Sequence, residues 1–354
     1  MTTRRICAAA VALALLLCAT AARSYYKLAG AGETMMDSAT KFLGTLTAEQ
    51  RSKAAIAYDD KQRTEWHFIP KPDAPATGFR EGVKVGDMND EQRKAAHTLL
   101  KAAMSEAGYS KATQIMALEG LLHELEKSKG GKNIRDTQRY FFTVYGAPTP
   151  ESKWGLSVEG HHLSLNFVVD KGHVVSTTPS AFGANPAIVK SDNIPSIKKG
   201  TRVLAKEETL ALELFASLTA DQKKEAVIAD KPPSEVRAAG APQAANEAAK
   251  GILGDKLTGQ QRGILRSLVE EYANSFPPDV AKERMEAVQA DGSSKIRFGW
   301  AGSEKEGEGR YYCIQGTSFQ IEFINVQPDS AGNPANHIHS VWRDLRGDFA
   351  LPAK

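Results

Sequence analysis

Cysteine is almost absent from this chain, which has three cysteines among 354 residues. Cys7 and Cys18 lie in the N-terminal apolar stretch, so Cys313 is the only cysteine in the rest of the sequence. A single thiol cannot form an internal disulfide, and the stability of the fold must therefore come from its core. Cys313 lies in an apolar, strand-like pattern, which favours a small buried side chain over a nucleophile or a soft metal ligand.

The chain also lacks the short motifs of the best-known nucleotide and nucleophile sites. It has no Gly-rich phosphate loop, no dinucleotide-binding glycine fingerprint, no Cys-x-x-Cys pair and no Gly-x-Ser-x-Gly nucleophile elbow. An excess of one charge sign is missing as well, since 45 Lys and Arg residues face 42 Asp and Glu residues. With no long basic run, the charge pattern gives no reason to expect a nucleic-acid partner.

Apart from one apolar stretch at the N-terminus, the sequence has no long hydrophobic run. Residues 1–22 begin with Arg4-Arg5, continue with about a dozen apolar residues and end in Ala19-Thr20-Ala21, which is the pattern of a secretory signal peptide. The run is shorter than the ~20 residues that cross a bilayer, although an uncleaved anchor is the alternative. We predict export to the periplasm or beyond, with no stable membrane span after cleavage.

The remaining sequence, with 42% hydrophobic and 25% charged residues, is that of a globular protein. In four places a Thr or Asn precedes Gln by three residues, which is a helix N-terminus signature. These pairs are Thr47 and Gln50, Asn89 and Gln92, Thr219 and Gln222, and Thr258 and Gln261. We predict helices over 42–58, 90–107, 111–126, 207–218, 222–229, 258–272 and 279–289.

The order of these signals predicts an internal duplication. Gln50 and Gln222 are 172 residues apart, Gln92 and Gln261 are 169 apart, and Gly160 and Gly316 are 156 apart. We expect an α+β fold, with two pseudo-repeated helix-helix-hairpin halves, residues 23–200 and 201–354, packed around a central antiparallel sheet. Three segments rich in Pro, Gly or Ala are expected to be irregular: a loop over 66–86, a connector over 178–199 and a mobile surface insertion over 231–249.

Four of the eight histidines fall in two strand-like clusters. In the stretch 154–167, the apolar alternation changes parity at Gly160, which predicts a strand with a bulge beside His161 and His162. The polar face beyond that bulge carries His162, Ser164 and Asn166. Near the end of the chain, His337 and His339 project to one side of an extended segment.

Imidazoles paired in this way are typical ligands of zinc, copper or iron. We predict a metal site formed by His162, His337, His339 and Glu322, with His161 in reserve. A hydrolase would also need acid, base or anion-binding groups, and the candidates are Glu159, Asp344 and Arg343. Asn166 and Asn336 are candidate supporting groups.

Other interpretations of the histidines remain open. A closed or redox-active site would make the protein a carrier or an oxidase, and a non-catalytic metal-binding or ligand-binding envelope protein is the main alternative to a hydrolase. The histidines could also hydrogen-bond in a polar seam between two hairpins, and Arg343 and Asp344 could be a simple ion pair. The substrate, small or polymeric, and the oligomeric state are not indicated by any pattern.

Several motifs together resemble an exported bacterial family known as domain of unknown function 3500. They are W-H-F-I-P from Trp66, Q-R-K-A-A from Gln92, E-G-H-H-L-S-L-N at 159–166, Y-Y-C-I-Q-G-T-S-F-Q-I-E-F at 311–323 and N-H-I-H-S-V-W-R-D at 336–344. The resemblance covers nearly everything after the signal peptide. It implies no established reaction, so the functional hypothesis depends on the histidines.

Overall fold

The structure is a computed structural model that describes residues 30–70, 80–127, 129–130, 134–191 and 197–353. The predicted signal peptide, residues 1–22, lies outside the described residues. Ala31–Lys354 forms one compact unit. Among the described helices, none combines the length and apolar composition needed to cross a membrane.

The described residues of this unit form a central mixed sheet of 13 strands in the order β1-β3-β4-β5-β7-β13-β12-β11-β10-β8, with β2, β6 and β9 pairing to β3, β5 and β10. The β1–β3 and β8–β10 pairs are parallel and the others are antiparallel. The strands are β1 (Ala55–Ile56), β2 (Val83–Lys84), β3 (Phe141–Tyr145), β4 (Lys153–Gly160), β5 (Leu163–Asp170), β6 (His173–Ser176), β7 (Ser180–Ala184), β8 (Val227–Ala229), β9 (Ile252–Leu253), β10 (Arg297–Gly302), β11 (Arg310–Gln315), β12 (Phe319–Asn325) and β13 (Ile338–Asp344). The predicted α+β class is confirmed, but the sheet is larger than expected and mixed.

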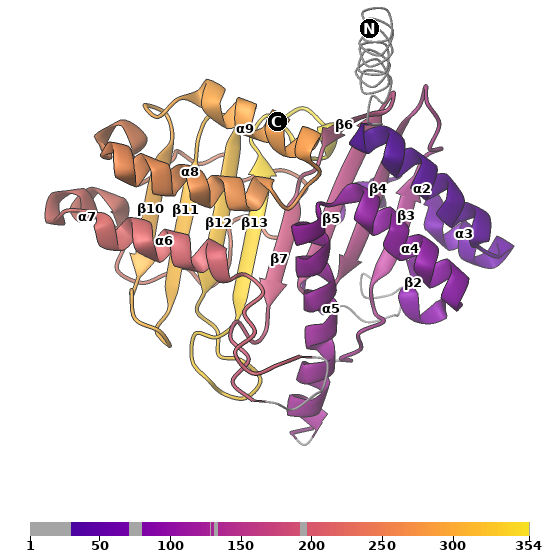
Figure 1. The fold of residues 1–354 in the computed structure, drawn as a ribbon, viewed down its shortest axis with the longest axis horizontal. Coiled ribbons are helices and arrows are strands. Elements are labelled where there is room, and N and C mark those ends of the chain that lie inside the picture. Colours follow the sequence, from indigo (N-terminus) through magenta and orange to yellow (C-terminus); the bar gives the residue numbers. More distant parts are fainter. Residues whose placement is uncertain (1–29, 71–79, 128, 131–133, 192–196, 354) are drawn as a thin grey trace, which may run out of the picture. The chain divides into compact units, whose positions relative to one another are not determined.

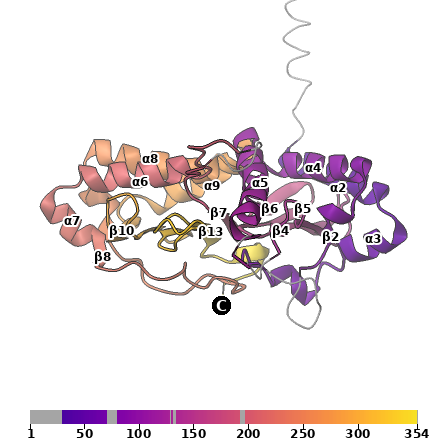
Figure 2. The same cartoon turned by 90° about the horizontal axis from the view of Figure 1, so that it is seen from below.

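The described residues also form eight α-helices, most of which cover one face of the sheet (Figures 1 and 2). They are α2 (Ala31–Thr45), α3 (Ala48–Ala54), α4 (Asp90–Ala103), α5 (Glu106–Lys127), α6 (Ala205–Ser217), α7 (Ala220–Ala226), α8 (Gly259–Ala273) and α9 (Pro278–Asp291), with short 3₁₀ turns η1 (Lys61–Thr64), η3 (Val85–Asp87), η4 (Gly254–Lys256) and η5 (Asp348–Ala350). Irregular segments run across the other face (Figure 2).

All four predicted capping boxes form, at the starts of α3, α4, α7 and α8. The prediction of one helix over 42–58 is wrong, because the Thr47 cap begins a new helix and the chain leaves α3 into β1 at Ala55. An N-cap residue is extended, so it cannot continue a helix that precedes it.

The stretch 154–167 is a hairpin and not a bulged strand. Gly160 pairs with Leu163, and His161 and His162 form the two-residue turn between β4 and β5. His162, the second residue of this turn, has a φ of 62°, in the left-handed region. A two-residue turn shifts the apolar alternation from even to odd positions, and a bulge within one strand does the same. The sequence pattern alone therefore could not distinguish a hairpin from a bulged strand.

The predicted connector 178–199 contains β7, which pairs with β5 on one side and β13 on the other. Its sequence, Ser-Ala-Phe-Gly-Ala, has small residues and a single large apolar one, so it lacks the usual strand signal. All five residues are nevertheless buried. This missed strand joins the sheet of the first half to that of the second.

The two faces of the sheet carry separate cores. The larger one lies under the helices, and the smaller one includes Trp66, Phe68, Val236, Cys313 and Val341. Cys313 is buried as predicted, and burial raises the pKa of its thiol to about 11. The 231–249 segment is irregular, yet its Val236 is part of this second core and Ala241 O accepts a hydrogen bond from Trp66 Nε1 at 2.8 Å. It is therefore a structural cover and not simply a surface insertion.

Candidate metal centre

Strand β13 turns alternate side chains to the two faces of the sheet. Ile338 and Trp342 join the core under the helices, and Val341 joins the core on the other face. His339 shares the face of Val341, because residues two apart in a strand point the same way. His337 precedes the strand, where its backbone N–H donates to Asn325 Oδ1 at 3.0 Å.

His162 reaches the same place from the β4–β5 turn. Its N–H donates to Phe68 O and its carbonyl accepts from Gly183 N–H, each at 2.7 Å. Gly183 pairs with His339 across β7 and β13, so it lies beneath both imidazoles. A Cβ at Gly183 would come within 2.9 Å of His162 Cδ2, which explains why the smallest residue stands there.

These three histidines form a compact cluster. One ring nitrogen of each of His162, His337 and His339 lies within 4.8 Å of the others. His162 Nε2 and His337 Nε2 are 2.8 Å apart, and the ring centroids are 4.7 to 5.3 Å apart. Residues about 175 positions apart in the chain thus converge on one point, where they could hold a metal ion.

Second partners orient two of the rings. His339 Nδ1 lies 2.7 Å from Glu235 Oε2, which leaves its Nε2 for another contact. His337 Nδ1 lies 3.4 Å from the Asn185 amide nitrogen, while Asn185 Oδ1 is buried without a hydrogen-bond partner among the described residues. A half-turn of that amide would bring Oδ1 to the His337 N–H. A carboxylate or carbonyl behind the imidazole is the usual arrangement at metal-ligating histidines.

Burial keeps the imidazoles of His162 and His337 neutral. It lowers the pKa of His162 well below its usual value and that of His337 to about 3, and the neighbouring histidines lower both further. Neutral imidazole is the form that coordinates a metal. His162 and His337 therefore offer lone pairs without first losing protons at neutral pH.

His161 lies behind this cluster and takes part in a different group. Its ring stacks on that of His162 with centroids 3.6 Å apart. Its Nδ1 contacts the Glu119 carboxyl and lies 2.9 Å from Arg135 Nη1. Although Glu119, His161 and His162 are close enough to hold a cation, the guanidinium at the same nitrogen disfavours one there. Burial raises the pKa of Glu119 to about 8, and Arg135 opposes this shift.

Glu322 and Arg343 do not join the histidines. Glu322 accepts from Tyr311 Oη at 2.7 Å and pairs with Arg237 Nε at 3.1 Å. Arg343, fully buried, pairs with Asp348 at 2.6 Å. Asp344, the next residue, pairs with Arg346 at 2.8 Å. The expected Arg343–Asp344 ion pair is therefore wrong, since successive strand residues face opposite sides of the sheet.

The remaining candidates lie on β4, β5 and the segment before β13. Glu159 accepts from Ser164 Oγ at 2.8 Å and lies 3.8 Å from Arg80 Nε. Asn166 donates to Pro179 O at 3.1 Å. Asn336 holds the approach to β13 by donating to Asp329 at 2.7 Å and to Ile188 O at 3.0 Å. Asn336 thus supports the position of His337 through the backbone.

Residues 29–351 match the family model described as Protein of unknown function (DUF3500). The chain belongs to the DUF3500 family. No curated protein and no solved structure matches it.

In this DUF3500 chain, the sequence patterns did not reveal the residues that support the histidines. Glu235 lies in the segment expected to be a mobile insertion, Asn185 in the expected connector, and Glu119 and Arg135 in or after a helix. None of these has a spacing that relates it to a histidine. Their roles come from pairings over 26 to 152 residues, which the sequence pattern does not encode.

Proposed function

We propose that this protein holds one divalent metal ion at His162, His337 and His339 and acts as a metal-dependent hydrolase. The observation that carries the proposal is the convergence of three ring nitrogens within 4.8 Å of one another. Ligand nitrogens about 2.0–2.1 Å from a tetrahedral zinc are roughly 3.3 Å apart, so modest side-chain rotations would close the set around an ion.

The donor set favours zinc or copper. Imidazole suits both metals, whereas a magnesium or calcium site would require oxygen ligands. The contact between Glu235 and His339 is of the kind that raises the basicity of a ligand and holds its orientation. A polar seam of hydrogen-bonded histidines is supported less well, because all three rings turn a nitrogen toward one point.

Three protein ligands suit catalysis because they leave a coordination position free for substrate or water. A divalent cation supplies Lewis acidity there, polarising a substrate oxygen or activating water. Glu235 contacts Nδ1 of His339, on the edge of the ring away from Nε2, so it supports the ligand and is not placed to transfer a proton at the open position. Glu159, Asp344 and Arg343 are engaged in other contacts, so we assign no acid-base role to them. This chemistry suits small and polymeric substrates alike.

One observation favours a non-catalytic metal-binding or ligand-binding protein instead. His162 and His339 are only 2% and 7% exposed, so their access to solvent is narrow. His337 is more exposed, and a substrate would have to approach from its side. Metal-dependent turnover of ester or phosphoester probes separates the two functions, because a carrier would bind the metal without turnover.

We also propose that the protein is exported and that its halves arose by duplication. Export is supported by the sequence of residues 1–22 alone. Duplication is supported by matched side-chain pairs: Gln50 bonds to Gln92 in the first half, and Gln222 bonds to Gln261 in the second. The order of strands around β7 and β13 is likewise mirrored.

Metal analysis of the purified protein tests the site. We expect about one zinc or copper ion per chain, lost in the His337→Ala, His339→Ala double variant. Glu235→Gln should weaken metal affinity by about 10-fold to 100-fold, as losses of such supporting partners do.

His123→Ala is the matched control, because His123 is an exposed histidine on α5. It should keep the full metal content. Stoichiometric metal in the folded double variant, or no metal in the wild type after incubation with zinc and with copper, would contradict the proposed centre.

A further inference from the structure

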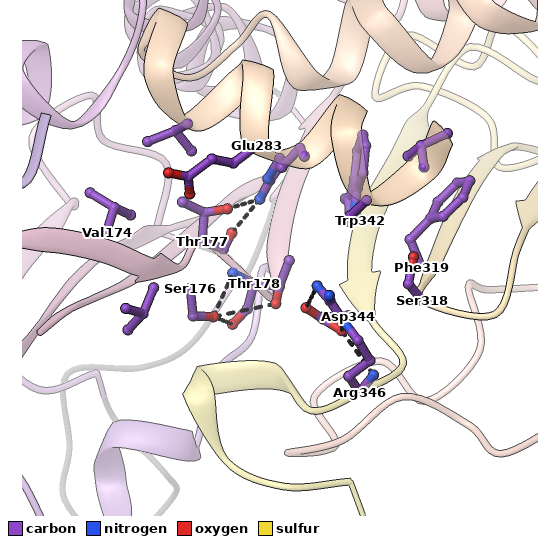
Figure 3. A pocket seen from close by; sticks show the side chains of 15 residues that line it. Val174, Ser176, Thr177, Thr178, Glu283, Ser318, Phe319, Trp342, Asp344 and Arg346 are labelled. Atoms are coloured by element: carbon purple, nitrogen blue, oxygen red, sulfur yellow. Dashed lines mark hydrogen bonds and ion pairs between the residues drawn. The ribbon is translucent and has the colours of Figure 1, made fainter. Parts of the chain in front are cut away.

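A pocket lies at the other end of β13 from the histidines. It is a cavity of about 110 Å³ between β6, α9 and the end of β13, and its lining includes Ser176, Thr178, Arg284, Trp342 and Asp344. Figure 3 shows Ser176, Thr177 and Thr178 on one side and Trp342 and Asp344 on the other. With a rise of about 3.3 Å per strand residue, Asp344 is roughly 16 Å along β13 from His339. The pocket is therefore distinct from the proposed metal centre.

Arg284 enters this pocket with one nitrogen, Nη1, that has no hydrogen-bond partner among the described residues. Its guanidinium carbon lies 4.0 Å from the ring centroid of Phe276 and 4.7 Å from that of Trp342. Its Nη2 donates to Thr177 O at 2.9 Å and contacts the Thr177 hydroxyl. Nη1 is buried and has no hydrogen-bond partner among the described residues. A buried N–H without a partner costs free energy, and such a group in a polar cavity is suited to a ligand.

The charges in the pocket leave the Arg284 cation without a dedicated partner. Arg346, which also lines the cavity, is paired with Asp344 through two contacts of 2.8 and 3.0 Å. Glu283 is exposed at the rim. Burial lowers the pKa of Arg284 to about 9 while Asp344 and Asp348 oppose the shift, so the guanidinium stays charged at neutral pH.

The rest of the wall is partly apolar. Val174, Val280, Val288 and Trp342 line the cavity together with the Ser176 hydroxyl, whose contacts to Thr178 are 3.3 to 3.5 Å long. The one cation without an ion-pair partner matches one negative charge, and a phosphate dianion would need more donors and more positive charge than remain here. The small volume limits the ligand to a few non-hydrogen atoms.

We propose that this pocket binds a small organic monocarboxylate, which accepts a hydrogen bond from Arg284 Nη1 and packs its short carbon chain against Trp342 and the valines. This site is independent of the proposed hydrolase function. It uses Asp344 as the partner of Arg346 and not as a catalytic acid.

Isothermal titration of the purified protein with acetate and with lactate, at constant ionic strength in sodium chloride, tests the site. We expect saturable binding of one carboxylate per chain, with phosphate at least 10-fold weaker. Arg284→Gln should weaken carboxylate binding at least 10-fold. No saturable binding of either acid, or binding of phosphate as tight as that of the carboxylates, would overturn the assignment.

Two further variants separate the pocket from the fold and from the histidines. Ala287→Leu adds carbon atoms to the cavity lining from α9 without removing a polar contact, so it should abolish binding while thermal unfolding stays cooperative. His337→Ala lies at the other end of β13 and should leave carboxylate affinity unchanged. Full carboxylate affinity in both Arg284→Gln and Ala287→Leu would place the ligand elsewhere.

Discussion

At the scale of single residues, the candidate metal centre depends on two positions. His162 has an unusual backbone conformation, and Gly183 has no room for a larger side chain. His162 adopts a positive φ in a two-residue turn, which directs its ring back over β7. Gly183 leaves room for that ring, since a Cβ would lie 2.9 Å from His162 Cδ2 and 2.9 Å from Ile338 O. The histidine can therefore meet His337 only because a neighbouring strand lacks a side chain at this place.

Gly183→Ala is expected to displace His162 and to destabilise the fold. Overpacking a close-packed site costs about 1–3 kcal/mol, and movement of the ring would lower the metal content of the protein. Urea denaturation together with metal analysis measures both effects.

The control is Gly263→Ala on α8, where a new Cβ would meet no atom within 4 Å. Because alanine is the better helix former, this change should raise stability by about 0.5–1 kcal/mol and leave the metal content intact. If Gly183→Ala behaved like this control, the position of His162 described above would be wrong.

At the scale of elements, the two central hairpins have turns of different chemistry. The β4–β5 turn carries His161 and His162, whereas the turn between β11 and β12 is held by Asp291 at the end of α9. Asp291 accepts the backbone N–H groups of Thr317 and Ser318 and the Ser318 hydroxyl, each at 2.9 Å. The second turn thus has a stabilising carboxylate where the first has His162, a candidate metal ligand.

Asp291→Asn is expected to destabilise the protein by about 1–3 kcal/mol at pH 7, because the bonds to the charged carboxylate are weakened. Burial by itself would raise the pKa of Asp291, but hydrogen bonds from Thr317 and Ser318 outweigh it and lower the pKa below 3.8. A carboxyl with a lowered pKa stabilises the fold above its unfolded pKa and loses that contribution as pH falls through its folded pKa.

The difference between wild type and Asp291→Asn should therefore shrink as the pH falls below about 4, which urea denaturation at several pH values would measure. Asp255→Asn, at an exposed position, serves as the control and should change little. A stability difference that stays constant from pH 7 to pH 2 would contradict this role of the carboxylate.

At the scale of the whole molecule, the two halves share one sheet and the larger of its two cores. Five residue pairs join β7 to β13, and the larger core draws residues from both halves. Lys111 on α5 donates to Glu207 on α6 and to Glu271 on α8, each at 2.7 Å. The cluster itself is divided, since His162 comes from the first half and His337 and His339 from the second.

Fragments 23–200 and 201–354 are expected to fold and bind metal only when produced together. Alone, each would expose β7 or β13 as a sheet edge and part of the shared core, which favours aggregation. Copurification, circular dichroism and metal analysis of the mixed fragments measure this. Cooperative unfolding of a single fragment, or stoichiometric metal bound to one, would show that the halves are independent.

Much of the local structure could be predicted from sequence. The four capping boxes formed where Thr or Asn precedes Gln, and the hairpin strands and the buried Cys313 follow from short-range alternation. Strand β7 could not be predicted, because its small residues give no strand signal. The turn at His161 could not be predicted either, because a hairpin turn and a β-bulge shift the apolar alternation in the same way.

The sequence by itself determined most of the helices and strands, with β7 as an exception, because these elements depend on neighbours a few residues apart. The tertiary structure alone decided that His162 meets His337, that Glu235 supports His339 and that Glu322 pairs with Arg237. These contacts join segments 85 to 175 residues apart, and they depend on the order in which strands pair. Strand order is set by the packing of the whole sheet, which short-range patterns do not encode.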